Sequence, residues 1–253
     1  MKFYSFGLLE EVKLLHEHHY SGALFTYNIE HGDYFTRIAN TIDKEIDFKY
    51  MVAIRPYTIS PQYLCMINNS MNTISKNRIQ VNLISGILQE YEKDFGGVLG
   101  ETNDLSSAIN KSEYLTEYIE TIEKIKRKIP DYYVTVTNEF VFNKASSLGS
   151  KMIIPYEDYK NNLYNLDNQK VMIAIAPIVR ETKEELENKN FVSTLNNMGF
   201  FTYEEFGALL EELKNKGIDE VMICLWNKKE KKIINKIVKE YREKENKSKM
   251  WDN

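Results

Sequence analysis

Cysteine is scarce in this sequence: two residues among 253, far apart at Cys65 and Cys224. Each lies in an apolar helical or strand pattern, so we expect buried thiols in a reducing compartment. Long apolar runs are also missing, since no stretch approaches the length of a membrane span. The first residues lead into a charged segment without the apolar core of a signal peptide. These absences predict a cytoplasmic protein.

Positive charge is not in excess, because the formal net charge is −4. This balance argues against a general binder of nucleic acid or anionic membranes. Histidine is limited to four residues, all within the first 31. His16, His18 and His19 look like a metal cluster, but on a helix these spacings point in different directions, whereas zinc needs convergent ligands. We therefore expect no metal site.

Hydrophobic residues make up 43% of the chain, which is enough for a sizeable core. The central stretch predicts a strand over Tyr50–Ile54, a helix over Gln62–Ser75 and a strand over Arg78–Ser85. Ser60 suits the N-cap of that helix, and Pro61 suits its first turn, where no amide hydrogen is needed. Together these segments form one βαβ unit, whose strands should be parallel with a right-handed crossover.

Strand-like and helix-like segments alternate along the whole chain, and no linker or composition break divides it. This alternation predicts a single (β/α)₈ barrel domain over residues 1–253, with a frayed tail from Lys247. Two capping boxes, Thr182 with Glu185 and Thr202 with Glu205, should each open a helix. The eight expected strands are Met1–Phe6, Gly22–Tyr27, Tyr50–Ile54, Arg78–Ser85, Tyr132–Thr137, Lys151–Ile154, Val171–Val179 and Asp219–Leu225. The expected helices before residue 150 are Leu9–His19, Asp33–Lys44, Gln62–Ser75, Lys111–Lys128 and Phe140–Leu148.

Polar residues gather at the carboxyl ends of the expected strands, where barrel enzymes carry their chemistry. Arg55 is either a functional cation or part of a salt bridge across the barrel mouth. Gln80 and Asn82 alternate on one face of their strand, and amides inside a barrel need hydrogen-bond partners. Asn82 therefore either bonds within the core or contacts a ligand. His31 follows the second strand and is either a functional residue at the mouth or a surface-loop histidine.

The central stretch resembles the signature of the bacterial luciferase-like flavin-dependent monooxygenases, most closely the alkanesulfonate branch. The matching residues are Val52-Ala53-Ile54-Arg55-Pro56, Ile59-Ser60-Pro61, Met66, Ile74-Ser75, Asn77-Arg78 and Asn82-Leu83-Ile84-Ser85-Gly86. The resemblance continues to Val179-Arg180-Glu181-Thr182. It implies a luciferase-like barrel with shortened loops.

The resemblance also implies a function: an FMN-dependent monooxygenase acting on a small organic substrate, with reduced FMN supplied by a separate reductase. On this basis Asn82, Ser85, Tyr114, Thr137 and Asn138 would bind the flavin, while His31 and Arg55 would line the catalytic pocket. Tyr114 could equally be a packed helix aromatic. The family commonly pairs through helices near these strands, so we expect a homodimer. The helix Gln62–Ser75 supports this expectation because it is apolar over a wide arc.

Several positions depart from the family pattern. Thr135-Val136-Thr137-Asn138 stands where the family has the Gly-Gly-Ser-Ser turn that binds the flavin phosphate. Ala174 and Ala176 stand where the sulfonate branch has a substrate-binding arginine and a catalytic histidine. The flavin-covering lid is cut to about Asn188–Phe201. Two alternatives therefore stay open: a non-catalytic or degenerate flavin-binding barrel, and a deazaflavin-dependent oxidoreductase.

Overall fold

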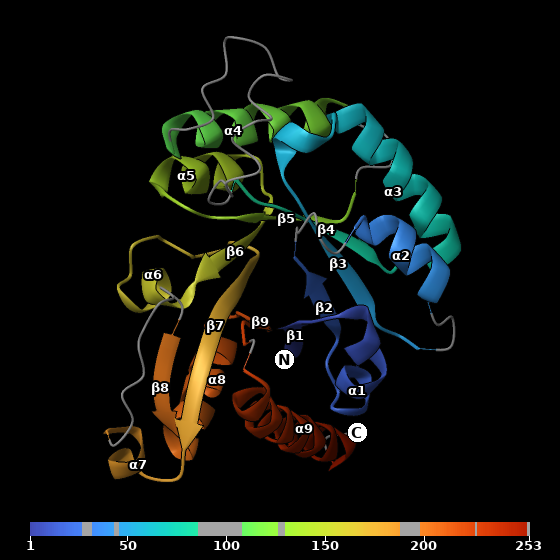
Figure 1. Ribbon diagram of the computed structural model, residues 1–253. Coiled ribbons are helices and arrows are strands. Elements are labelled where there is room, and N and C mark those ends of the chain that lie inside the picture. Colours follow the sequence, from blue (N-terminus) through green and yellow to red (C-terminus); the bar gives the residue numbers. More distant parts are fainter. Residues whose placement is uncertain are drawn as a thin grey trace.

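A computed structural model describes residues 1–26, 32–42, 46–85, 108–125, 130–187, 198–225 and 227–251. Its strands lie at the centre and its helices lie around them (Figure 1). Buried apolar side chains of the strands and of the inner helix faces form the core. The strands are β1 (Lys2–Phe6), β2 (Gly22–Phe25), β3 (Lys49–Ile54), β4 (Ile79–Leu83), β5 (Tyr132–Thr135), β6 (Lys151–Pro155), β7 (Val171–Arg180), β8 (Met198–Thr202) and β9 (Glu220–Ile223).

Eight of these strands close into a parallel barrel, as the sequence predicts. β1 pairs with both β2 and β9, and β6 pairs with β7, so that the ladder runs β1-β2-β3-β4-β5-β6-β7-β9 and returns to β1. β7 is long enough to serve two purposes. Its first half pairs with β6 and β9 inside the barrel, and its second half, from Ala176 to Arg180, pairs with β8.

The strand β8 corrects the sequence interpretation, which placed Asn188–Phe201 in a lid. Met198–Thr202 is a strand that lies outside the barrel beside the far half of β7 (Figure 1), while 188–197 lies outside the described residues. The expectation of one strand between Val171 and the Thr202 helix was therefore wrong. The assignment of these residues to the lid rests on the family resemblance alone, whereas the burial along Met198–Thr202 alternates as in a strand.

The α-helices follow their local sequence signals. They are α1 (Val12–Glu17), α2 (Tyr34–Thr41), α3 (Pro61–Ser75), α4 (Ala108–Ile125), α5 (Glu139–Ser147), α6 (Tyr156–Lys160), α7 (Lys183–Glu187), α8 (Tyr203–Asn215) and α9 (Lys228–Trp251), with short 3₁₀ turns at Leu9–Glu11 and Pro56–Thr58. Ser60 caps α3 by accepting from the Tyr63 amide, as expected. None of the described helices is long and apolar enough to cross a membrane.

Helix ends account for most of the remaining differences from the sequence prediction. Asp33 is the N-cap of α2, so that helix begins one residue later than expected and ends at Thr41. The predicted first helix divides into a 3₁₀ turn and α1. The short α6 was not predicted. Lys76 and Asn77 both have a positive φ after α3, which confirms the expected left-handed stop.

A hydrogen bond across the barrel identifies the inward face of each strand. The Tyr133 hydroxyl on β5 donates to Glu220 Oε2 on β9 at 2.7 Å, although β5 and β9 are not neighbours in the ladder. Both side chains must therefore point inward. Because paired residues of adjacent strands face the same side, the register also turns Asn82, which pairs with Tyr133, and Met172, which pairs with Glu220, into the barrel.

The helix α9 connects distant parts of the chain through ion pairs. Glu230, in its first turn, holds Arg180 at the end of β7 through two hydrogen bonds of 2.6 and 2.8 Å. Both side chains are more than nine-tenths buried, and the hydrogen bonds that Arg180 donates to Glu230 raise the pKa of Arg180. The next residue, Lys231, bonds the Phe6 carbonyl at the end of β1 and the Glu11 carboxylate.

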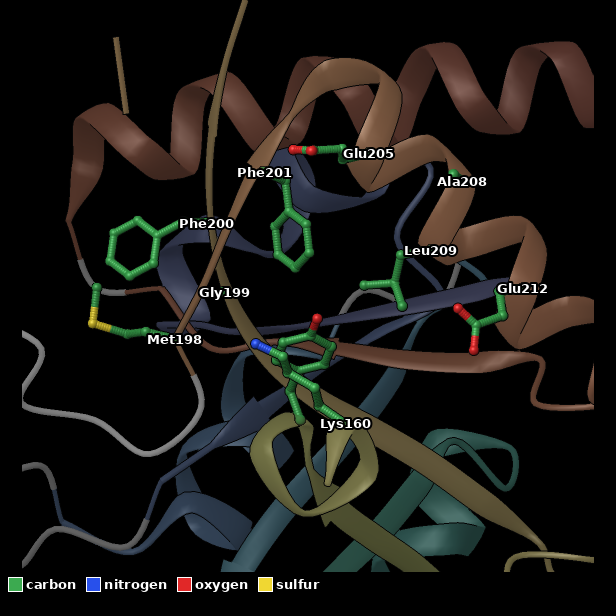
Figure 2. A pocket seen from close by; sticks show the side chains of 10 residues that line it. Lys160, Met198, Gly199, Phe200, Phe201, Glu205, Ala208, Leu209 and Glu212 are labelled. Carbon is green, nitrogen blue, oxygen red and sulfur yellow. The ribbon is translucent and has the colours of Figure 1, made fainter. Parts of the chain in front are cut away.

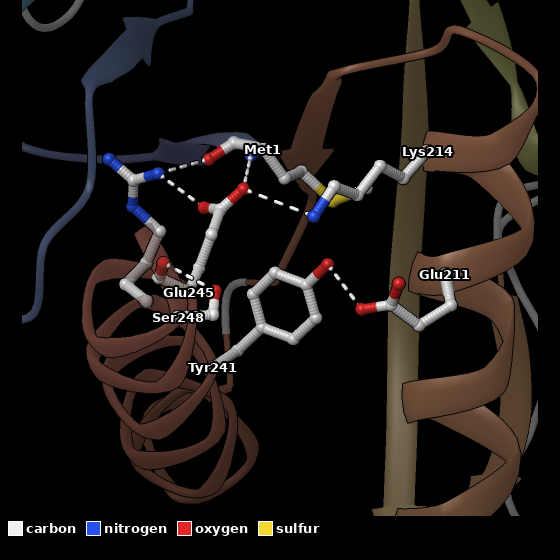
Figure 3. Close-up of polar contacts among 7 residues, drawn as sticks. Met1, Glu211, Lys214, Tyr241, Glu245 and Ser248 are labelled. Atoms are coloured by element: carbon white, nitrogen blue, oxygen red, sulfur yellow. Dashed lines mark hydrogen bonds and ion pairs between the residues drawn. The ribbon is translucent and has the colours of Figure 1, made fainter. Parts of the chain in front are cut away.

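The last turns of α9 carry a second buried carboxylate (Figure 3). Glu245 accepts from the Met1 nitrogen at 2.7 Å and from Arg242 at 2.8 Å, and it lies 3.5 Å from the Lys214 ammonium on α8. One carboxylate therefore joins the start of β1, α8 and α9. A buried carboxylate near each end of α9, Glu230 and Glu245, therefore joins the helix to the barrel.

We predict that Glu230→Ala lowers the free energy of unfolding by about 3–5 kcal/mol, because it leaves the buried Arg180 guanidinium without its counter-ion. Urea denaturation measures the change. Glu240→Ala on the same helix is the control: its partner Lys236 is 77% exposed and lies 3.8 Å away, so the change should stay within about 0.5 kcal/mol. Equal effects of the two substitutions would contradict the assigned role of the buried pair.

Candidate functional site

Side chains from three neighbouring strands meet at the carboxyl end of the barrel. Arg55, just after β3, donates from Nη1 to the Ser85 carbonyl at 3.2 Å. Ser85, just after β4, places its hydroxyl 3.4 Å from that of Thr137, just after β5. Arg55 and Ser85 are buried, and Thr137 is exposed. The structure thus brings together three residues that the sequence singled out, in a row that ends at solvent.

The next residue, Asn138, is the N-cap of α5. Its side-chain oxygen accepts from the Val141 amide at 3.0 Å, and its nitrogen donates to the Ser112 hydroxyl on α4 at 2.8 Å. The amide side chain is therefore held on both sides and fixes the start of α5 against α4. The exposed Thr137 directly precedes this N-cap, and a helix N-terminus is favourable for an anion.

Asn82 lies inside the barrel, 2% exposed, and accepts from the Thr135 hydroxyl at 2.8 Å. Of the two roles left open by the sequence, this bond supplies the core partner that a buried amide needs. Sequence reasoning missed Thr135, as it missed Ser112. The signal for Thr135 was present: it alternates with Tyr133 and Thr137 in the β5 segment, so it shares their inward face.

The remaining sequence candidates lie apart from this row. Tyr114 on α4 is partly buried and packs against the hydrophobic core. His31 lies outside the described residues, so its role stays a prediction. Ala174 is 6% exposed and pairs with Met222, an alternate residue from Glu220, so the small side chains of Ala174 and Ala176 face the barrel interior. No charge or proton-transfer group comes from these two positions.

The clustered histidines have partners close to them in the structure, and both cysteines are buried. His18 Nδ1 lies 2.8 Å from the Leu14 carbonyl, and His19 lies 4.0 Å from Glu243. Within the described ranges, no three His, Cys, Asp or Glu side chains are placed to hold a metal. Cys65 and Cys224 are both free and buried, and burial raises the pKa of each thiol. The thiols of Cys65 and Cys224 therefore stay protonated at neutral pH and are poor nucleophiles.

A cavity of about 690 Å³ lies between the first turns of α2 and α3, against the outer face of β3. Phe35, Ile59 and Ile67 contribute apolar surface, and the N-cap residues Asp33 and Ser60 contribute polar groups. Tyr63, at its edge, is 54% exposed. The cavity opens near the carboxyl end of β3, on the helix side of the strand that leads to Arg55.

A second hollow of about 510 Å³ lies between α6, β8 and α8 (Figure 2). Gly199 forms part of its wall, because a Cβ there would lie 2.3 Å from the Phe201 ring. Of the two carboxylates at its edge, Glu212 bonds Lys216 and Tyr159, and Glu205 bonds the Thr202 amide. These carboxylates are engaged in holding α8, so the hollow offers little specific chemistry.

Comparison with known proteins establishes the fold class. No protein-family model and no curated protein matches the sequence. Solved structures do match it along nearly their whole length. A monooxygenase from Streptomyces bottropensis is 12% identical with a TM-score of 0.64, and the alignment covers 95% of this chain and 98% of that chain.

Two further structures show the same likeness. The EDTA monooxygenase from Chelativorans sp. BNC1 is 8% identical, with a TM-score of 0.67 and coverage of 97% of this chain and 94% of that one. The coenzyme F420 dependent tetrahydromethanopterin reductase from Methanopyrus kandleri is 10% identical, with a TM-score of 0.61 and coverage of 94% and 96%. The fold is therefore the luciferase-like (β/α)₈ barrel that the sequence predicts. At these low sequence identities the comparison shows the fold and does not show the activity.

We predict that Asn138→Ala lowers the free energy of unfolding by about 1 kcal/mol, because α5 loses its N-cap. Asn138→Ser, which keeps a capping oxygen, should recover most of the loss. Thr137→Ala changes an exposed side chain and should stay within about 0.5 kcal/mol. Thermal denaturation of the three variants compares them, and a Thr137→Ala loss as large as that of Asn138→Ala would speak against this assignment.

Proposed function

We propose that this chain is a flavin-dependent monooxygenase of the luciferase-like family, which takes reduced FMN from a separate reductase and acts on a small organic substrate. The observation that carries the proposal is the row Arg55–Ser85–Thr137 beside the start of α5 at the carboxyl end of the barrel. In barrels of this kind the carboxyl end carries the chemistry. The likeness to two monooxygenases supports the proposal at the level of the fold.

The residues present fit the phosphate of FMN in their donor chemistry. The Thr137 hydroxyl is exposed and the adjacent amides open α5, so a hydroxyl donor and a helix N-terminus lie side by side. Asn138 would act mainly through the cap, because both of its side-chain polar atoms are already bonded within the chain. Thr135 and Val136 in place of two glycines leave the Thr137 end as the place where an anion can approach.

The other proposed residues would hold and shield the cofactor. Ser85 would support Thr137, Asn82 would fix Thr135 in the wall beneath, and Tyr114 would contribute an aromatic face from α4. Arg55 would place a buried positive charge at the mouth, and His31 would complete the pocket from the β2 side. Reduced flavin, when bound, supplies the chemistry with dioxygen, while the protein orients it and excludes water.

Two alternatives to a flavin-dependent monooxygenase are each supported by a specific observation. The small Ala174 and Ala176 remove an arginine and a histidine that the sulfonate branch uses, which favours a non-catalytic flavin-binding barrel and argues against sulfonate turnover. The likeness to a coenzyme F420 dependent reductase favours a deazaflavin-dependent oxidoreductase. Titration of the protein with oxidised FMN, reduced FMN and a deazaflavin, followed by an assay of oxygen consumption, separates the three.

We predict that FMN binding is weakened by about 1–3 kcal/mol in the double variant Thr137→Ala/Asn138→Ala, the range for lost charge-assisted hydrogen bonds. Fluorescence titration with FMN gives the dissociation constants. Thr73→Ala is the matched control, because Thr73 is an exposed threonine on α3 whose hydroxyl bonds the Asn69 carbonyl in its own helix. Unchanged affinity in the double variant would remove this turn from the proposed site.

We further propose that the protein forms a homodimer through α3. Tyr63, Met66 and Ile74 are 54, 64 and 41% exposed, and they lie at helical spacing along one side of α3. The apolar cavity between α2 and α3 adjoins Tyr63 and extends this surface. A second copy would bury these side chains, whereas the segment 87–110, most of which lies outside the described residues, is the alternative cover.

We predict that Tyr63→Glu dissociates the dimer, because a carboxylate buried at its centre would have no partner. Light scattering at micromolar concentration measures the mass. Tyr203→Glu on α8, where the tyrosine is 43% exposed, is the control and should leave the mass unchanged. A wild-type protein that is monomeric in this experiment would exclude the dimer.

A further inference from the structure

The amino end of the barrel holds a polar cavity of about 530 Å³, on the opposite side from the proposed flavin site. Its inner wall comes from inward-facing side chains of four strands: Tyr4, Gln80, Tyr133 and Glu220. Lys2, Lys49, Lys151 and Asp131 stand around its opening. The floor of a barrel is commonly apolar and packed, so this concentration of polar groups calls for a physical explanation.

Three carboxylates line the cavity, and two of them, Glu220 and Asp131, are each held by one lysine and one neutral donor; the third is Asp47. Glu220 accepts from Lys2 at 2.9 Å and from the Tyr133 hydroxyl at 2.7 Å. Asp131 accepts from Lys151 at 2.6 Å and from Gln80 Nε2 at 2.8 Å. The positive groups are at the opening, where the Lys2 side chain is 52% exposed and that of Lys151 36% exposed. The inner wall presents two acceptors, the Glu220 carboxylate and the side-chain oxygen of Gln80.

One acceptor on the inner wall has no partner. Gln80 is 3% exposed, and its side-chain Oε1 has no hydrogen-bond partner within the described structure. A buried carbonyl without a donor is costly, so such groups are commonly satisfied by water or a ligand. Burial raises the pKa of both Tyr4 and Tyr133, so both phenols keep their protons, and Tyr133 donates its proton to Glu220 rather than to Gln80. The wall therefore calls for a hydrogen-bond donor that comes from the cavity.

We propose that this cavity binds a small zwitterion, an amino acid whose ammonium group lies against Gln80 Oε1 and Glu220 and whose carboxylate lies among the lysines at the opening. An ammonium group supplies three donors to a wall of acceptors. A carboxylate complements the exposed ammonium groups of Lys2 and Lys151. The volume exceeds by far the ~30 Å³ share of one water molecule. This site is independent of the proposed monooxygenase activity.

The experiment is isothermal titration calorimetry on the full chain. The probes are unbranched amino acids of increasing length, from glycine through 4-aminobutanoate to 5-aminopentanoate, with ethylamine and acetate as single-charge controls. We expect at least one amino acid to bind with a Kd of about 1 mM or tighter, and both controls to bind at least about tenfold more weakly. Absence of binding by every amino acid up to about 10 mM would overturn the proposal, and water would then satisfy Gln80. Ethylamine binding as tightly as the best amino acid would overturn the zwitterion assignment.

Two variants place the ligand in the cavity. Gln80→Met keeps the side-chain length but removes the carbonyl, and it should weaken amino-acid binding at least about tenfold. Gln62→Met, at an exposed glutamine on α3, is the matched control and should change nothing. Lys2→Gln alters a half-exposed side chain, and it should weaken amino-acid binding without weakening ethylamine binding, because Glu220 stays in the wall and loses its ion-pair partner. If Gln80→Met does not fold, the Lys2→Gln result decides, and unaltered amino-acid binding there would overturn the proposal.

Discussion

The closed parallel hydrogen-bond ladder is the constraint on which the rest of this structure depends. Once β1 pairs with both β2 and β9, each barrel strand has a neighbour on both sides, and each must alternate its side chains between lumen and helix layer. The bond from Tyr133 to Glu220 across the lumen follows from this geometry. Asn82 and Thr135 meet for the same reason, since adjacent strands place them on the same inward side.

Closure also gives the barrel two ends of different chemistry. At the carboxyl end, the chain leaves each strand and enters a helix, so Arg55, Ser85 and Thr137 meet beside the start of α5. At the amino end, the chain enters each strand, and Lys2, Gln80 and Glu220 surround a polar cavity. The two ends differ because the strands are parallel: each helix follows a strand, so the helix N-termini lie at the carboxyl end. A cofactor phosphate suits that end, whereas the amino end must use side-chain charges.

Helix α9 stabilises the closure from outside. In its first turn, Glu230 accepts from Arg180 and Lys231 donates to the carbonyl at the end of β1. In its last turns, Glu245 accepts from the Met1 nitrogen. These bonds join the first, seventh and last strands, which are distant in sequence. Water barely reaches the Arg180–Glu230 pair, so removing one partner would expose the other to an apolar surrounding. The helix thus determines how firmly the last strands are held.

The sequence by itself determined the eight barrel strands, the Ser60 cap and the left-handed stop at Asn77, because each is a local pattern read within a few residues. It also placed Arg55, Ser85 and Thr137 at the same end, because each follows a strand of a parallel barrel. The partners of these residues were decided by tertiary structure. Ser112 reaches Asn138 from another helix, and β8 becomes a strand only because the far half of β7 offers it a ladder. Pairings between segments far apart in the chain depend on register and closure, which no local pattern contains.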